Sequence, residues 1–179
     1  MTGLIKKLTT QQILEENLAQ KAPEKLSTAK VVLHNIRSLH NVGSVFRSSD
    51  AFGVSEILIS GYTPTPPRPE ITKTAIGAEE FVKWSYWDDT SKLLSYLKDE
   101  DYTIIGLEQT NNSIPLTDLN LSSFGRICLV MGNEVTGIDD DFLPHVDCFV
   151  NIPQFGRKHS LNVSVAAAVT LYAMLEKLS

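Results

Sequence analysis

The sequence predicts an α/β fold with a mostly parallel sheet flanked by helices. Short apolar segments alternate with segments of helical periodicity along the chain, which is typical of strands joined by crossover helices. Lys30–His34 and Arg126–Met131 are largely apolar, as expected for strands covered on both faces of a parallel sheet. With 179 residues, 42% of them apolar, the chain is long enough for one domain with a sizeable core.

The chain begins with a predicted amphipathic helix over residues 4–20, which Pro23 ends. We interpret residues 1–27 as a short helical arm and residues 28–179 as a single domain. After the first strand, Lys30–His34, Asn41 is expected to cap a helix that stops near Gly53. The next predicted elements are a strand at 54–60 and a stiff, proline-rich loop at 61–69. A helix at 71–80, a strand at 81–87, a helix at 88–98 and a strand at 102–107 follow.

The last third of the chain predicts a strand, a polar loop and a buried helix. Residues 115–123 are expected to be irregular. A buried strand at 126–131, a short helical turn at 139–143 and the last strand at 146–152 follow. Ser160 is expected to cap the last helix, whose apolar residues lie on all sides through Leu175 and indicate burial. Asn162 is an unusual polar residue in this first turn, and it is either an extra capping group or a functional one.

Composition excludes several classes of protein. Cys128 and Cys148 lie in apolar, strand-like segments, and indicate core thiols of a reduced intracellular protein rather than a disulfide or metal site. The four histidines do not fall at zinc-ligand spacings. The N-terminus lacks a signal-peptide apolar region, and the longest apolar stretch is too short to span a bilayer. We therefore expect a cytoplasmic protein with neither a metal nor a membrane partner.

The charge of the chain is uneven. The net charge of −5 argues mildly against a nucleic-acid partner. Residues 1–73, however, carry nine Lys and Arg against six Asp and Glu, a net charge of +3, and residues 74–179 carry seven against fifteen, a net charge of −8. This distribution is compatible with a local basic face on an acidic protein.

Common nucleotide-binding and hydrolase motifs are missing from the sequence. Residues 132–137 have the glycine spacing of a phosphate loop, but Ile138 and Asp139 replace its lysine and hydroxyl residue. No G-x-G-x-x-G follows a strand, and no G-x-S-x-G is present. Three polar loops remain, 35–47, 132–137 and 153–162, each at the carboxyl end of a predicted strand. Open α/β sheets bind their ligands at that edge.

These loops carry the polar side chains Asn41, Arg47, Glu134, Ser160 and Asn162. Arg47 is a candidate phosphate clamp because its planar guanidinium matches phosphate oxygens, although a surface arginine would look the same in the sequence. Glu134 is either a site residue or a carboxylate favoured by the dipole at a helix start.

Three motifs in these loops resemble those of the SPOUT superfamily, specifically the SpoU/TrmH-type RNA ribose 2′-O-methyltransferases. The first is N-V-G-S-V-F-R at 41–47 with D-A-F-G at 50–53, and the second is L-V-M-G-N-E-V-T-G-I at 129–138. The third joins I-P at 152–153 to S-L-N-V-S-V-A at 160–166. The motifs occur in the family's order and spacing, and the resemblance covers residues 28 to 178. It implies a parallel α/β domain with a deep trefoil knot near the C-terminus, a rare exception to unknotted topology.

The resemblance also implies S-adenosyl-L-methionine as the cofactor, held within the knot, and an obligate homodimer. By position it carries the cofactor contacts to Gly132, Ile152 and Leu161, with the strand end at Leu107 and Glu108 as a further expectation. The apolar last helix is compatible with a homodimer, since it could bury a second face against a partner. Candidates for RNA phosphate contacts are Arg47, Arg68, Lys73, Arg157 and Lys158.

The implied reaction is methyl transfer to a ribose 2′-hydroxyl of RNA, with tRNA favoured over rRNA. In the family, the arginine that matches Arg47 is proposed to activate this hydroxyl together with an RNA phosphate. Because an arginine pKa lies above about 12, we expect Arg47 to align phosphate and oxygen and to stabilise negative charge. Asn41, Glu134, Ser160 and Asn162 would orient the ribose. The alternatives are an RNA base methyltransferase of the same fold and a non-catalytic RNA-binding protein.

Overall fold

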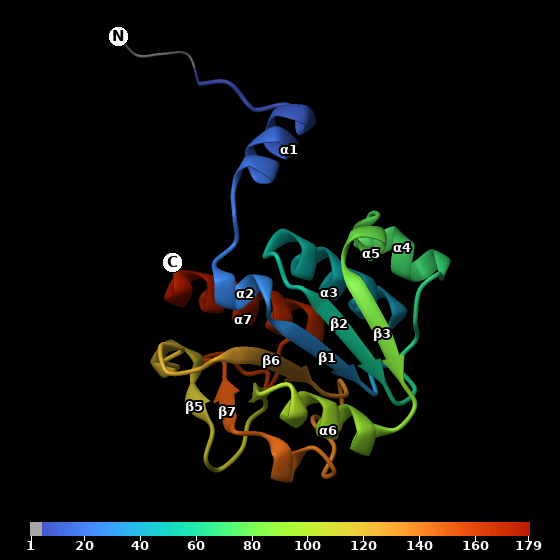
Figure 1. Cartoon of the computed structure of the whole chain (residues 1–179), viewed down its shortest axis with the longest axis vertical. Helices are drawn as coiled ribbons and strands as arrows, with labels where there is room; N and C mark the ends of the chain where they lie inside the picture. The colour runs from blue at the N-terminus through green and yellow to red at the C-terminus, as the bar shows by residue number, and fades with distance from the viewer. Residues whose placement is uncertain (1–4) are drawn as a thin grey trace.

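The computed structural model describes residues 5–179, and over this range it contains one seven-stranded sheet in which every pairing is parallel. The strand order is β3-β2-β1-β6-β4-β7-β5 (Figure 1). The strands are β1 (Lys30–His34), β2 (Glu56–Ser60), β3 (Lys83–Trp87), β4 (Tyr102–Leu107), β5 (Ile114–Pro115), β6 (Arg126–Met131) and β7 (Cys148–Asn151). The predicted α/β class is therefore confirmed.

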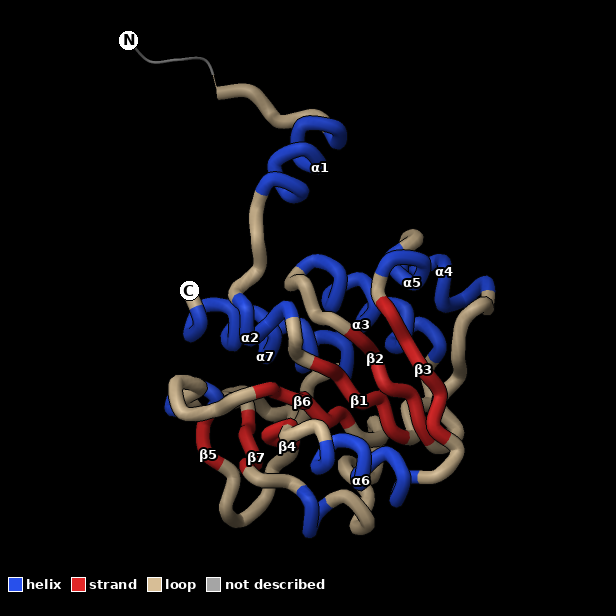
Figure 2. Tube along the Cα trace, in the orientation of Figure 1, coloured by secondary structure: helices blue, strands red, loops and turns tan. Residues whose placement is uncertain are grey.

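Helices cover both faces of the sheet unequally (Figure 2). One face carries α2 (Glu24–Ser27), α3 (Leu39–Ala51), α4 (Pro69–Ala75), α5 (Ala78–Phe81) and α7 (Val163–Leu178), and the other carries α6 (Thr90–Asp99). Leu33, Phe46 and Leu171 belong to the larger apolar cluster, between the sheet and α3 and α7. Leu93 and Phe142 belong to the smaller cluster beneath α6. The two clusters explain why the central strands are apolar on both faces.

Strand β6 occupies the centre of the sheet although it is among the last strands in the chain. It pairs with β1 on one side and with β4 on the other, so that Cys128 lies opposite both Lys30 and Ile104. Cys128 is fully buried and Cys148 partly so, and both are free thiols. Because the strands are parallel, the loops after β1, β4, β6 and β7 all leave the sheet at one edge.

The helix predicted over residues 4–20 is shorter, and forms α1 (Thr10–Ala19); residue 4 lies outside the described residues. Thr9 and Gln12 form a capping box that fixes its start. Helix α1 has no buried residue and stands apart from the sheet (Figure 1). The boundary at residue 27 and the role of this arm stay predictions.

The helix predicted over residues 71–80 is divided into α4 and α5. Ile76 and Gly77 both have positive φ, 53° and 88°, and they break the helical hydrogen-bond pattern. Gly53 follows α3 with a φ of 71°, as its predicted role at a helix stop requires. The turn predicted at 139–143 lies slightly later, as a 3-10 turn at Leu143–His145, and residues 115–123 include another at Leu116–Asp118.

Both predicted helix caps are wrong, and in each case a nearby residue caps the helix. Ser38, not Asn41, begins α3, because its hydroxyl accepts the backbone N–H of Asn41. Asn162, not Ser160, begins α7 and accepts the N–H groups of residues 164 and 165. The capping interpretation of Asn162 is thus confirmed, although its amide makes a second contact described below.

Helix α7 is not buried on all sides in the single chain. Leu171 and Met174 are fully buried, whereas Val165, Val169 and Tyr172 are 49%, 40% and 51% exposed. These three residues follow helical spacing and form one apolar stripe. Within residues 5–179, no helix is both long and apolar enough to cross a bilayer. The trefoil knot stays a prediction.

Candidate active site

A cavity of about 370 Å³ lies at the carboxyl edge of the sheet, where several loops meet. The end of β4 forms one wall, the loop after β6 forms another, and the segment from the end of β7 to the first turn of α7 closes it. This volume lies in the range of small-molecule sites, about 300–1,000 Å³. Its position agrees with the general placement of ligands in open α/β sheets.

All five residues expected at the cofactor line this cavity: Leu107, Glu108, Gly132, Ile152 and Leu161. Glu108 also has a structural role, because its Oε2 accepts the backbone N–H of Ile138 at 3.0 Å. That contact joins the end of β4 to the loop after β6. The cavity therefore combines apolar side chains with a loop that is fixed by a carboxylate.

A chain of three polar side chains joins the three predicted loops. Asn41 donates its amide to Glu134 Oε1 at 2.9 Å, and its own amide oxygen accepts Nδ2 of Asn162 at 3.0 Å. Asn162 in turn accepts the backbone N–H of Ser164 at 2.9 Å. These side chains come from residues far apart in the sequence. The Glu134–Asn41–Asn162 chain thus fixes the starts of α3 and α7 against the loop after β6.

Glu134 is held as a carboxylate. Burial by itself raises the pKa of Glu134, but donors to its oxygens lower that pKa below its usual range. The donors are the backbone N–H groups of Arg37 at 2.9 Å and Ser38 at 3.1 Å, and the amide of Asn41. Glu134 thus lies at a helix start, as one interpretation of the sequence expected. That helix is α3, which follows β1, whereas Glu134 itself lies in the loop after β6. An anion at this position is favoured by the helix dipole.

Replacing Glu134 with glutamine is expected to lower the free energy of unfolding at pH 7 by about 1–3 kcal/mol. Because the folded-state pKa is lowered from about 4.5, the carboxylate stabilises the fold at pH values above 4.5, and this contribution is lost as the pH falls through the lowered pKa. Urea unfolding of wild type and variant at pH 7 and in strong acid measures this contribution. The difference in unfolding free energy from wild type should be full at pH 7 and should vanish in acid. The control Glu80→Gln, which replaces a glutamate on α5, should show no difference at either pH. A difference of equal size at both pH values would contradict the prediction.

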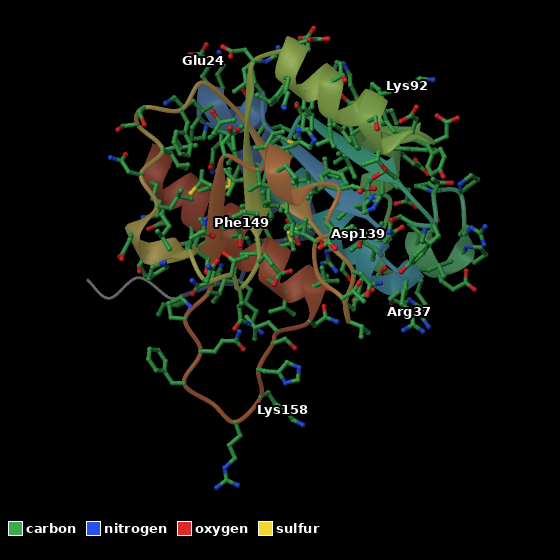
Figure 3. The ribbon with its side chains drawn as sticks, turned by 90° about the horizontal axis from the view of Figure 1, so that it is seen from below. Glu24, Arg37, Lys92, Asp139, Phe149 and Lys158 are labelled. Atoms are coloured by element: carbon green, nitrogen blue, oxygen red, sulfur yellow. The ribbon has the colours of Figure 1, made fainter. Side chains whose placement is uncertain are left out.

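The remaining predicted residues lie at or beyond the mouth of the cavity. Ser160 lines the cavity and is exposed. Arg47 is exposed on α3, six residues after Asn41 and about 9 Å further along the helix axis. It does not line the cavity within one chain. The other basic candidates are also exposed: Arg68, Lys73, Arg157 and Lys158. Lys158 lies on a loop that projects from the body of the protein (Figure 3).

Asn133 and Gln109 are site residues that the sequence reasoning did not include. Asn133 is 7% exposed, and its Oδ1 accepts two backbone N–H groups of its own loop, at residues 135 and 136. Its Nδ2 donates to the carbonyl of Asn35 at 2.8 Å and to the hydroxyl of Tyr62 at 2.7 Å. Gln109 donates to the carbonyl of His159 at 2.7 Å, across the cavity mouth. An asparagine directly after a strand-ending glycine is a turn signal that could have indicated Asn133.

Comparison with known proteins gives a consistent result. The model of the SpoU rRNA Methylase family matches residues 28–172. A curated protein of Staphylococcus saprophyticus, assigned to the TrmH family of tRNA/rRNA methyltransferases, is 31% identical over 159 residues, 88% of this chain and 62% of that protein. The chain therefore spans less than two thirds of the length of this relative.

Solved structures share the fold. The AdoMet-bound rRNA methyltransferase from Sinorhizobium meliloti has a TM-score of 0.77 at 24% identity, over 86% of this chain and 57% of that one. A structure described as an RNA 2′-O ribose methyltransferase has a TM-score of 0.75 at 24% identity, over 91% of this chain and 61% of that one.

Proposed function

Because the chain belongs to the SpoU rRNA Methylase family, we propose that it is an S-adenosylmethionine-dependent methyltransferase that acts on a ribose 2′-hydroxyl of tRNA or rRNA. The observation that carries this proposal is the Glu134–Asn41–Asn162 chain beside the 370 Å³ cavity. It joins three separate loops, and those after β6 and β7 line one ligand-sized space. Two proteins of similar fold support the proposal, one an AdoMet-bound rRNA methyltransferase and the other an RNA 2′-O ribose methyltransferase.

The cavity fits S-adenosylmethionine chemically. Leu107, Ile152 and Leu161 offer apolar contact to an adenosine, and Glu108 and Gln109 offer polar atoms at the same wall. Gly132 lies at the end of β6, where its backbone forms part of the lining. These residues would hold the cofactor, which supplies an electrophilic methyl group on its sulfonium when it is bound.

The residues of the chain would then position the ribose and stabilise charge. Glu134 accepts three hydrogen bonds and has a lowered pKa, so it is a poor proton acceptor and serves as a positioning residue. Asn41 and Asn162 hold the loops, and Ser160 presents a hydroxyl at the mouth of the cavity. Arg47 would bind an RNA phosphate and stabilise the negative charge that develops on the 2′-oxygen. Most of the rate would come from this alignment.

The proposal includes a homodimer. The apolar stripe Val165, Val169 and Tyr172 is about half-exposed on α7 in the single chain, and burying it against a second copy would remove that surface from water. Because Arg47 lies outside the cavity of its own chain, we propose that the site is completed only when two chains come together.

Methyl transfer from labelled S-adenosylmethionine to total tRNA and to rRNA tests the function. We expect labelled 2′-O-methyl nucleosides after complete digestion, binding of S-adenosylhomocysteine in calorimetry, and a dimer in analytical ultracentrifugation. Labelled base-methylated nucleosides would instead indicate the alternative base methyltransferase. A chain that neither binds S-adenosylhomocysteine nor labels either RNA would overturn the proposal. Mapping the 2′-O-methyl marks that are missing from RNA of a deletion strain would then identify the nucleotide.

A further inference from the structure

A second hollow of the surface lies beside the cavity and has a different chemistry. It is an open groove of about 640 Å³ where the loop after β2 meets the edge strand β3. Its walls include Tyr62, Trp84 and Tyr86, and two arginines, Arg37 and Arg68. We refer to it as the aromatic groove. Arg68 was expected at an RNA phosphate, whereas neither the aromatic residues nor Arg37 were among the expected site residues.

The two tyrosines are anchored at one end while their rings stay accessible. Tyr86 donates its hydroxyl to the carbonyl of Gly61 at 2.8 Å and is 50% exposed. Tyr62 accepts Nδ2 of Asn133 at 2.7 Å and is 61% exposed. Trp84 lies on the same face of β3 as Tyr86 and packs against the core. Rings held in this way lose little conformational entropy when a planar group stacks on them.

The groove is selective for negative charge. Arg37 and Arg68 are exposed, and Figure 3 shows Arg37 at the periphery with its side chain directed outward. Among the described residues, no aspartate or glutamate lines the groove, although the whole chain has a net charge of −5. Two guanidinium groups beside accessible aromatic rings suit a ligand that carries both phosphates and flat bases.

The groove shares a wall with the cavity. Asn133 and Glu134 line the cavity, and on their other side they bind Tyr62 and the backbone of Arg37. An RNA segment in the groove would therefore lie next to the cavity. This adjacency favours an occupant that is part of the same substrate as the group in the cavity.

We propose that the aromatic groove binds a single-stranded RNA segment adjacent to the methylated nucleotide. Two bases stack on Tyr62 and Tyr86, and the phosphates between them bind Arg37 and Arg68. A paired RNA helix does not present base faces to side chains, so the occupant is single-stranded. The inference rests on the proposed function, because it assigns to that RNA substrate a place on the protein.

Binding of a short, unstructured, fluorescein-labelled oligoribonucleotide, measured by anisotropy at several salt concentrations, tests the groove. Tyr86→Ala should weaken binding about tenfold, since it removes one stacking platform. It should leave the salt dependence unchanged. Arg68→Ala should weaken binding and reduce the slope of log K against log salt by about 0.7, as expected for one lost phosphate contact. Tyr86→Phe, which keeps the ring, should bind nearly as wild type does.

Phe81→Ala is the matched control. Phe81 is an aromatic residue with 78% exposure that ends α5 just before β3 begins, and it does not line the groove. Its loss should therefore not change RNA binding. Thermal unfolding shows whether each variant folds, and Arg37→Ala provides a second test should Tyr86→Ala fail to fold. Unchanged affinity in the folded Tyr86, Arg68 and Arg37 variants would overturn the proposal, as would equal affinity of wild type for a duplex of the same sequence.

Failure of the groove and failure of the proposed function give different results. If wild type methylates RNA and binds S-adenosylhomocysteine while the groove variants bind the oligoribonucleotide normally, only the groove is refuted. If wild type does neither but Tyr86→Ala and Arg68→Ala still weaken oligoribonucleotide binding, the groove stands and the methyltransferase proposal fails.

Discussion

Replacing Arg47 with alanine is expected to lower the rate of methyl transfer by about 10²–10³-fold, the usual cost of removing a group that stabilises transition-state charge. Arg47 is exposed and lies outside the cavity, so neither the fold nor cofactor binding depends on it within one chain. Binding of S-adenosylhomocysteine and the midpoint of thermal unfolding should therefore stay near wild type. Single-turnover kinetics with the unmethylated substrate RNA measures the loss in rate directly.

Arg126→Ala is the control for this prediction. Arg126 begins β6 at the opposite edge of the sheet, where it pairs with Glu100 at 2.7 Å, and a surface pair of this kind contributes little to stability. Its loss should leave the rate of transfer unchanged. Arg47→Lys should restore only part of the rate, because lysine keeps the charge but not the bidentate fork. Near-normal turnover by Arg47→Ala would refute the proposed role of this residue.

Replacing Gly132 with valine is expected to lower cofactor affinity by roughly 5- to 150-fold, because overpacking costs about 1–3 kcal/mol. The resemblance places a cofactor contact at Gly132, which a side chain would obstruct. The structure gives a different physical reason. A Cβ at Gly132 would overlap with the backbone of Gly137 and Ile138, so the loop after β6 has to move. Titration calorimetry with S-adenosylhomocysteine measures the result.

Gly125→Val separates this effect from the general cost of replacing a glycine. A Cβ at Gly125 meets no atom within 4 Å, so this variant should bind S-adenosylhomocysteine as wild type does. Circular dichroism should show that both variants keep their secondary structure. Unchanged affinity in Gly132→Val would mean that the loop after β6 does not form the cofactor wall.

The sequence located the three loops because a simple rule connects them. Each follows a predicted apolar strand, and the carboxyl ends of parallel strands share one edge. In the structure, the loops after β6 and β7 line one cavity together with the end of β4. The segment after β1 does not line it, but Asn41 of that segment contacts Glu134 and Asn162. The strand order could not be predicted from the secondary-structure propensities of the residues. The place of β6 between β1 and β4 depends on pairings over long sequence separations.

The errors at the helix starts arise because two good capping residues stand close together at each start. Local preference does not choose between Ser38 and Asn41 at α3, or between Ser160 and Asn162 at α7. In the structure Asn41 gives its side chain to Glu134 and Asn162, and Ser38 caps α3 in its place. Asn133 was missed because its contacts to Asn35 and Tyr62 join distant segments. The apolar stripe on α7 was read as burial, although composition alone does not say which molecule covers it.

The central position of β6 has a consequence for synthesis of the protein on the ribosome. Strand β1 pairs with β2 soon after both emerge, but its second neighbour comes only when residues 126–131 have been made. Translation at about 5–20 residues per second leaves roughly 4–14 s between the two events. During that interval the apolar edge of β1 is an open template for strands of other nascent chains, so we expect the growing polypeptide to depend on chaperones that bind it before its release.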